Sequence, residues 1–142
     1  MPFLPAGLPL PQPTVDDAPF WEAARRHELV VQRCTKCGTF RHSPMPCCYN
    51  CQSFDHEWAK IKGNGIIFSY INVVHPVHPA LKDRVPFNVV LVELPEAGDV
   101  RMVGNVLDTP FEELYVGMPV EVTFEDIDAE TTLPQWKRAS TP

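Results

Sequence analysis

The sequence lacks a long apolar run, a leader for secretion and a surplus of positive charge. No segment approaches the roughly 20 consecutive apolar residues that span a bilayer, which excludes a membrane-spanning helix. Residues 1–13 contain no base and no continuous apolar stretch, so we expect a cytoplasmic protein with reduced cysteines. The formal net charge is −6, which disfavours a surface that wraps nucleic acid.

There is also little room for long helices, because sixteen prolines are spread over the 142 residues. Hydrophobic residues make up 44% of the chain and charged residues 21%, which is enough apolar material for a core. We therefore expect a mainly β protein. Several of the prolines lie within residues 1–13, and this predicts a proline-rich extended arm over residues 1–18.

One short helix is predicted directly after this arm. Asp17 is suited to cap its start, and Pro19 suits an early helical position. Residues 20–27 are helix formers, with Phe20 and Trp21 as the large apolar side chains. Two roles remain open for this aromatic pair, namely packing within its own domain or docking on another chain.

Two Cys-x-x-Cys pairs follow the helix. The first, Cys34 and Cys37, continues from an apolar strand and leads into Gly38, which lets the backbone turn so that its amides point at the sulfur atoms. The second pair, Cys48 and Cys51, follows after a short spacer. Four soft ligands at this spacing predict one tetrahedral, structural zinc ion with no free position for metal catalysis.

Other interpretations of the cysteines are less favoured. Redox chemistry at one Cys-x-x-Cys is disfavoured because two pairs lie close together. Iron fits the same four thiolates, and zinc is preferred because it is the more prevalent ion in such sites. Cys47 is interpreted as a small buried side chain, although it offers a replacement for Cys48 as a ligand. His42 and His56 are less favoured substitute ligands.

The rest of the chain shows short strands with turns between them. Apolar and alternating runs predict strands at residues 58–61, 66–74, 87–94, 100–107 and 119–124. Five such strands suit a small closed barrel, and their spacing fits an OB-fold about as well as a sandwich. We place the helix and ribbon at residues 19–55, the barrel at 56–128 and a solvated tail at 129–142.

Several segments stand in a distinctive order along residues 19–137. They are Pro19-Phe20-Trp21-Glu22, Gln32-Arg33 before the first cysteine pair, Pro44-x-Pro46 before the second, Lys62-Gly63-x-Gly65, Pro86-Phe87 and Gly117-Met118-Pro119-Val120. This order resembles the acyl-CoA-associated zinc-ribbon and OB-fold proteins, a family long known as a domain of unknown function. Cys47 departs from the pattern, where an aliphatic residue is expected.

The resemblance implies a mainly β fold with an N-terminal short helix, a rubredoxin-like zinc ribbon and a C-terminal five-stranded OB-fold barrel. It also implies a non-catalytic accessory subunit that forms a hetero-oligomer with a thiolase-superfamily enzyme. The partner classes are thiolases, hydroxymethylglutaryl-CoA synthase-like proteins and lipid-transfer-type aldolases. In such complexes the small subunit is expected to help hold the CoA moiety of an acyl-CoA.

Seven residues are candidates for contact with CoA or with the partner: Phe20, Trp21, Arg41, Lys60, Lys62, His75 and His78. The bases come from residues 19–62, where positive charge exceeds negative charge and suits a phosphate. The two histidines lie on a proline-rich loop beside the expected barrel mouth. A solvated surface remains the simpler interpretation for any single one of these side chains.

No catalytic residue is assigned, because no Ser, Cys or carboxylate near His75 and His78 completes a nucleophile-and-base set in the sequence. A thioester hydrolase is therefore the least favoured function. The main alternative to the accessory subunit is a single-stranded nucleic-acid binder with Phe68 and Tyr70 as stacking residues. Acids outnumber bases in residues 63–142, so the basic groove that such a binder needs is not expected.

Overall fold

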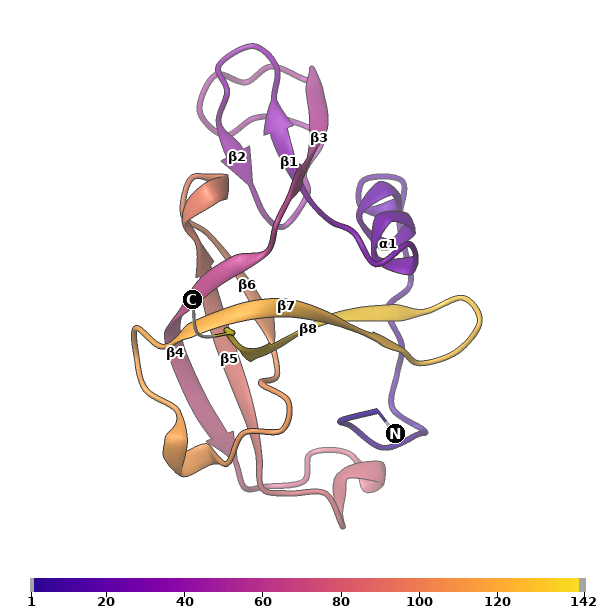
Figure 1. The fold of residues 1–142 in the computed structure, drawn as a ribbon. Coiled ribbons are helices and arrows are strands. Elements are labelled where there is room, and N and C mark those ends of the chain that lie inside the picture. Colours follow the sequence, from indigo (N-terminus) through magenta and orange to yellow (C-terminus); the bar gives the residue numbers. More distant parts are fainter. Residues whose placement is uncertain (1, 141–142) are drawn as a thin grey trace.

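Residues 2–140 are described by the computed structural model, and they form two antiparallel sheets and one α-helix (Figure 1). The helix α1 (Ala18–Arg25) is followed by β1 (Leu29–Cys34), β2 (Phe40–Arg41) and β3 (His56–Ile61). The second sheet contains β4 (Asn64–Val73), β5 (Phe87–Leu94), β6 (Val100–Gly104), β7 (Pro119–Asp126) and β8 (Thr132–Arg138). Short 3-10 turns lie at Pro79–Leu81, Pro95–Ala97 and Phe111–Glu113. The predicted mainly β fold is confirmed.

The helix α1 begins where the sequence predicts it. Pro19 stands in its first turn, and Asp17 immediately precedes the first helical residue. The Asp17 carboxylate does not cap the helix, because it accepts hydrogen bonds from the backbone N–H (2.6 Å) and the hydroxyl (3.1 Å) of Thr14 instead. Phe20 and Ala23 are buried, and the helix packs against β1 and β8.

The first residues of the proline-rich arm contact the second sheet. The backbone N–H of Phe3 donates to a carboxylate oxygen of Glu125 at 2.7 Å, and the Arg84 guanidinium donates to the Phe3 carbonyl at 2.7 Å. Arg84 also lies over the Phe3 ring, 4.9 Å from its centroid. The arm is therefore attached to the rest of the chain at Phe3, while Met1 lies outside the described residues.

The first sheet has the strand order β2-β1-β3 and forms the upper part of the molecule in Figure 1. β1 pairs with β3 from Leu29 opposite Ile61 to Cys34 opposite His56. Residues 58–61 thus pair in the ribbon sheet, whereas the sequence predicts them as the first strand of the barrel. The reason is that β3 runs almost directly into β4, so neighbouring apolar runs in the sequence serve two different sheets.

The connection from β3 to β4 is a bend at Gly63. Gly63 has a φ of +86°, and a Cβ there would lie 2.3 Å from Cγ1 of Val122, so glycine is required. The Glu96 carboxylate accepts hydrogen bonds from three successive backbone N–H groups at this bend. The donors are Lys62 at 3.2 Å, Gly63 at 2.8 Å and Asn64 at 3.3 Å. These charge-assisted bonds fix the bend.

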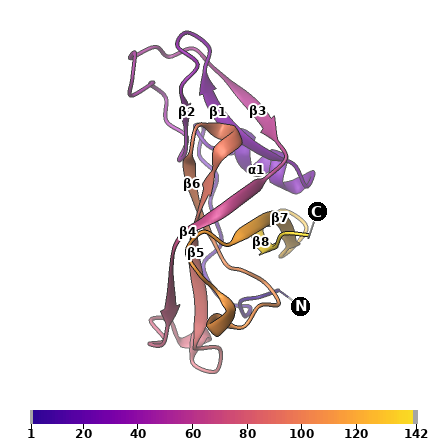
Figure 2. The same ribbon diagram turned by 60° about the vertical axis from the view of Figure 1, so that its left-hand side comes forward.

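The second sheet has the order β6-β5-β4-β7-β8 and curls into a half-barrel (Figure 2). Its two edges meet where Val106, just after β6, forms a parallel bridge to Trp136 of β8. The Trp136 N–H donates to the Asn105 carbonyl at 3.0 Å, and the Leu107 N–H donates to the Trp136 carbonyl at 2.8 Å. The predicted OB-fold is confirmed, with the barrel closed at this one place rather than all round.

The strand β8 lies in residues 129–142, for which the sequence predicts a solvated tail. It pairs with β7 along its length, and its Trp136 is fully buried. The sequence does not predict this strand, because Pro134 and the acidic residues before it are unusual in strands and proline interrupts most of them. β8 is an edge strand, where proline is tolerated, and residues 141–142 lie outside the described part of the chain.

A bulge after Ile67 shifts the register of β4 against β5. It separates the two aromatic residues that the nucleic-acid alternative would use. Phe68 is exposed beneath the guanidinium of Arg101, 3.7 Å from its ring centroid. Tyr70 is half-buried and packs against Phe111 with a centroid distance of 5.5 Å. The pair therefore forms no common stacking platform.

The core fills the inside of the half-barrel and continues to the helix and the base of the ribbon. Its largest fully buried apolar side chains are Trp136, Ile67, Leu94, Val31, Val90, Val92, Val106 and Val120. One continuous cluster joins residues of both sheets with those of α1, so the parts stabilise each other. Within residues 2–140, no helix has the length and apolar character needed to cross a membrane.

Gly65 offers a test of the close packing of β4 on β5. A Cβ at this position would lie 2.4 Å from Cγ1 of Val92 and 2.9 Å from the carbonyl oxygen of Glu93. We expect Gly65→Ala to lower the free energy of unfolding by about 1–3 kcal/mol, as overpacking does. Urea denaturation with zinc in excess measures the change. The exposed neighbour gives the control, since Asn64→Ala should cost less than about 0.5 kcal/mol. Equal losses in both variants would contradict the tight packing.

Candidate functional site

The four predicted zinc ligands come from two turns of the first sheet. Cys34 ends β1, and Cys37 follows in the turn before β2, where Gly38 has a φ of +79°. Cys48 and Cys51 lie in the long connection between β2 and β3. The Gly38 N–H donates to the Cys34 carbonyl at 2.9 Å. In the second turn the Gln52 N–H donates to the Cys48 carbonyl at the same distance. The two turns therefore have the same design.

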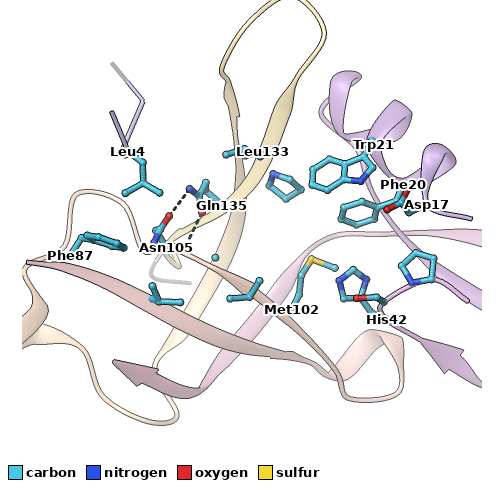
Figure 3. Close-up of a pocket in the computed structure, with 16 residues that line it drawn as sticks. Leu4, Asp17, Phe20, Trp21, His42, Phe87, Met102, Asn105, Leu133 and Gln135 are labelled. Atoms are coloured by element: carbon cyan, nitrogen blue, oxygen red, sulfur yellow. Dashed lines mark hydrogen bonds between the residues drawn. The ribbon is translucent and has the colours of Figure 1, made fainter. Parts of the chain in front are cut away.

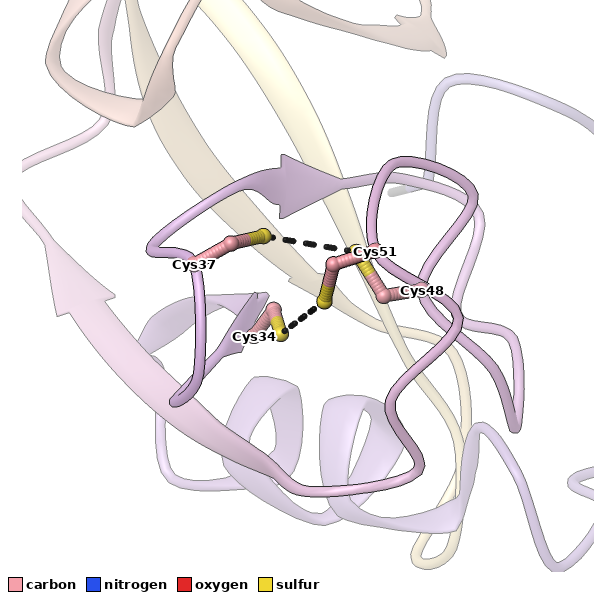
Figure 4. Close-up of side chains that lie close together, drawn as sticks. All are labelled: Cys34, Cys37, Cys48 and Cys51. Atoms are coloured by element: carbon pink, nitrogen blue, oxygen red, sulfur yellow. Dashed lines mark hydrogen bonds between the residues drawn. The ribbon is translucent and has the colours of Figure 1, made fainter.

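The four sulfur atoms converge on one point (Figure 4). All of them lie within 4.8 Å of one another. The Sγ atoms of Cys34 and Cys51 are 3.6 Å apart, as are those of Cys37 and Cys48. Four sulfurs at about 2.3 Å from a zinc ion lie about 3.8 Å apart in a tetrahedron, so these separations fit the ion closely. With four protein ligands the site is structural and has no position for a substrate.

The surroundings of the first turn favour thiolates. The backbone N–H of Cys37, and after it that of Lys36, lowers the pKa of Cys34 below its usual range despite burial. The hydroxyl of Thr39 lies 3.1 Å from Sγ of Cys37, and the Asn50 amide donates to the same sulfur at 3.6 Å. These contacts, with Thr39 the stronger, lower the pKa of Cys37 to about 5. The first turn is thus prepared to hold a cation.

Cys51 has the opposite tendency because four sulfur atoms are crowded together. The backbone N–H of Ser53 favours its thiolate, but burial and the three neighbouring cysteines outweigh that bond and raise the pKa of Cys51 to about 12. Thiolates at this distance repel one another in surroundings poor in water. A divalent cation at their centre offsets the repulsion, and zinc takes cysteine as thiolate. The donor set therefore fits zinc.

The substitute ligands lie outside this cluster. The thiol of Cys47 is half-buried and donates to the carbonyl of Cys48 at 3.7 Å. His56 is exposed, with Nδ1 3.1 Å from the Phe54 carbonyl. The His42 ring packs against the helix α1 instead. In the part of the chain that the structure describes, the four cysteines are the one group of such side chains arranged to hold a metal.

An apolar groove of about 440 Å³ lies between α1, the loop after β2 and the open side of the half-barrel (Figure 3). We call it the seam groove. Its principal walls are Phe20, Trp21, His42, Met102, Leu133 and Pro134. Phe20 and Trp21 meet edge to face, with ring centroids 5.1 Å apart. Leu4 of the arm lies at one end of the groove.

The seam groove carries little charge. Burial lowers the pKa of His42 to about 4, so this imidazole is neutral near pH 7. Asn105 and Gln135 satisfy each other, since Gln135 Nε2 donates to Asn105 Oδ1 at 2.9 Å and the Asn105 N–H donates to Gln135 Oε1 at 2.7 Å. The carboxylate of Asp17 is the one acidic group among the lining residues. The groove therefore suits an apolar occupant better than an anion.

The candidate contact residues are only partly brought together. Phe20 and Trp21 share the seam groove. Arg41 is buried in the ribbon and donates from Nε and Nη2 to the Met45 carbonyl at 3.3 and 3.0 Å. Lys60 is exposed, with Nζ 3.4 Å from a carboxylate oxygen of Glu28. These bases do not converge with the aromatic pair.

The remaining candidates lie elsewhere on the surface. Lys62 has an exposed side chain beside Pro95 at the bend between the sheets. His75 is exposed on the loop after β4. His78 has a local structural role, because its Nδ1 accepts a hydrogen bond from the Ala80 N–H at 3.1 Å and caps the turn Pro79–Leu81. Their contact with CoA or a partner stays a prediction.

The sequence does not predict the seam groove. Met102 and Leu133 form opposite walls, yet Met102 belongs to β6 and Leu133 to β8, where the sequence predicts a tail. The signal that was available was Trp136, a large aromatic residue in a segment expected to be solvated. A groove built from six segments far apart in the chain leaves no local pattern.

Two family descriptions match successive parts of the chain. Residues 21–57 match the rubredoxin-like zinc ribbon domain of ChsH2. Residues 58–125 match the C-terminal OB-fold domain of ChsH2. The first match covers most of α1 and the ribbon as far as the start of β3, and the second covers the rest of β3 and the half-barrel as far as β7.

The similar proteins include a CoA hydratase subunit and a scaffold protein. A probable enoyl-CoA hydratase alpha subunit of Thermomonospora curvata is 42% identical over 131 residues, which are 91% of this chain but 40% of that protein. The chain thus spans less than half the length of this curated relative. A DUF35 domain-containing scaffold protein of Methanocaldococcus jannaschii is 31% identical over 103 residues, 72% of this chain and 71% of that protein.

A solved structure shares the whole arrangement. A chain of the Ltp2-ChsH2(DUF35) aldolase superposes with a TM-score of 0.82 and 41% identity, covering 92% of this chain and 99% of that chain. The ribbon, the helix and the half-barrel therefore recur together in a protein of closely similar sequence.

Serine substitutions test which cysteines hold the ion. We expect Cys51→Ser to lose zinc and to unfold the ribbon, because three remaining thiolates bind it less tightly and the metal stabilises the fold. Metal analysis and circular dichroism of the purified chain measure both effects. Cys47→Ser is the matched control and should keep one zinc per chain, since Cys47 lies outside the cluster. Loss of zinc from the Cys47 variant alone would reassign the ligand.

Proposed function

The chain belongs to the ChsH2 family, whose members join a rubredoxin-like zinc ribbon to an OB-fold, and we propose that it is a non-catalytic accessory subunit of an acyl-CoA enzyme. The partner in this proposal is a thiolase-superfamily protein, with a lipid-transfer-type aldolase as the first candidate. The similar chain in the Ltp2-ChsH2(DUF35) aldolase supports this order of candidates. A hydratase is the other candidate, because a similar protein is named as a hydratase alpha subunit.

The observation that carries the proposal is an exposed apolar face on β4, β5 and β6. Ile71 lies opposite Val89, and Leu91 lies opposite Val103, so these side chains share one face of the sheet. Ile71 is 58% exposed and Val103 is 63% exposed. Contiguous apolar surface of this kind is typical of protein–protein interfaces and uncommon on monomers.

The chemistry of the described residues supports a non-catalytic role. The zinc site is closed by four cysteines, so it offers no activated water or Lewis acid to a substrate. His42 is the imidazole of the seam groove, and its lowered pKa makes it a poor base. Because the candidate contact residues lie apart from one another, only single exposed bases such as Lys62 would contribute to CoA binding.

Co-purification tests this function. We expect the tagged chain, expressed in its native cell with zinc present, to elute with a thiolase-superfamily protein in fixed stoichiometry. Mass spectrometry identifies the partner, and light scattering after size exclusion gives the stoichiometry. The isolated chain should show no turnover of acyl-CoA. A well-behaved monomer that binds none of the thiolase-superfamily proteins of its cell would falsify the proposal.

A further inference from the structure

The half-barrel leaves β6 as an open edge beside the seam groove. β6 pairs with β5 on one side, and the closure onto β8 begins only at Asn105 and Val106, after β6 has ended. Met102, Val103 and Gly104 of β6 line the groove. The edge of β6 therefore borders the groove directly.

The direction of the free backbone groups follows from Asn105. Its N–H and its carbonyl both point toward β8, to Gln135 Oε1 at 2.7 Å and to the Trp136 N–H at 3.0 Å. Backbone groups of alternate residues in a strand point the same way. Val103 and Arg101 thus present their N–H and carbonyl groups away from β5. Among residues 2–140, neither forms a backbone hydrogen bond outside the strand ladder.

The opposite wall of the opening shows the same pattern. Trp136 of β8 bonds toward the β6 side through both its N–H and its carbonyl. Pro134 lies two residues before Trp136, so its backbone also points away from β7 and toward the groove. The N–H that proline lacks would therefore not have bonded to β7. The carbonyl of Pro134 remains as an acceptor. Both borders of the seam groove therefore expose backbone groups beside apolar side chains.

The lining decides what kind of molecule fits. The phosphates of CoA are unsuited, because the groove offers the Asp17 carboxylate and a neutral His42 but no lining Lys or Arg. The arm of this chain is unsuited as an added strand, because prolines recur every two to four residues from Pro2 to Pro13 and cannot donate to a ladder. An extended, proline-poor apolar peptide satisfies both the backbone edge and the side-chain walls.

We propose that the edge of β6 accepts an extended apolar segment of the thiolase-superfamily partner as an added strand. The segment pairs with the backbone of Arg101 and Val103. Alternate side chains then enter the seam groove between Trp21 and Met102, and the others extend the apolar face that includes Val103. This assignment rests on the proposed function and adds the location and mode of docking to it.

A proline at the free edge tests the added strand. Val103→Pro removes the N–H that points away from β5 and leaves the ladder to β5 intact, so the chain should still fold and bind one zinc. We expect its affinity for the partner to fall about 10- to 100-fold, as when a buried hydrogen-bond partner is lost. Val103→Ala is the matched control, because it also loses the isopropyl group but keeps the N–H. It should bind much more tightly than the proline variant.

The results of these binding measurements distinguish failure of the added strand from failure of the proposed accessory function. Equal affinities of the proline and alanine variants overturn the added strand while leaving the accessory role in place. Failure of the wild-type chain to bind any thiolase-superfamily protein overturns both. Hydrogen exchange of the wild-type chain gives a second readout that needs no variant. The amides of Arg101 and Val103 should exchange more slowly in the complex than in the free chain, and unchanged exchange contradicts the proposal.

CoA provides the remaining comparison. Adding CoA alone to the free wild-type chain should leave exchange at Val103 unchanged, because the groove lacks bases for its phosphates. Protection of Val103 by CoA at concentrations that saturate the partner would assign the edge to the pantetheine arm and overturn docking of a peptide strand.

Discussion

The bend between β3 and β4 determines how the ribbon and the half-barrel meet. One carboxylate, that of Glu96, binds the N–H groups of Lys62, Gly63 and Asn64, and hydrogen bonds to an ionised acceptor are stronger than neutral ones. The absent side chain of Gly63 lets Val122 of β7 approach the bend. Since β3 and β4 are nearly continuous, the ribbon loop with His42 and the helix α1 stay beside the open side of the half-barrel. The seam groove is a consequence of this placement.

The zinc site and the core stabilise opposite ends of the same sheet. At one end, Leu29 and Ile61 of β1 and β3 belong to the apolar cluster that fills the half-barrel. At the other end, Cys34 of β1 is opposite His56, and apolar burial gives way to exposed polar residues. A small tip of this kind cannot bury enough apolar surface to hold its own loops, which is where a structural metal supplies the missing free energy.

The features that the sequence predicted are those with local causes. The spacing of Cys34, Cys37, Cys48 and Cys51 determines a tetrahedral site, and proline placement determines the start of α1. Strand β8 was missed because Pro134 looks like an interruption until the strand is known to be an edge. Residues 58–61 pair within the ribbon sheet because the bend at Gly63, and not the apolar pattern, separates the two sheets. The seam groove depends on contacts between distant segments, which the hydrophobic periodicity of the sequence does not predict.

β6 differs from the other edge strands in how its exposed edge is protected against pairing. Exposed strand edges invite pairing, and proteins protect them with charges, prolines, bulges or short length. β2 is only Phe40–Arg41, and the outer edge of β3 carries the exposed charged residues Glu57 and Lys60. β8 contains Pro134, and the part of β4 that extends beyond β7 contains the bulge after Ile67.

β6 contains no proline and no bulge. Its single charge, Arg101, lies over Phe68 and donates to Glu93 at 3.3 Å on the face of the sheet. An edge left open beside an apolar groove, in a molecule that protects its other edges, is the arrangement expected where another strand is to be received.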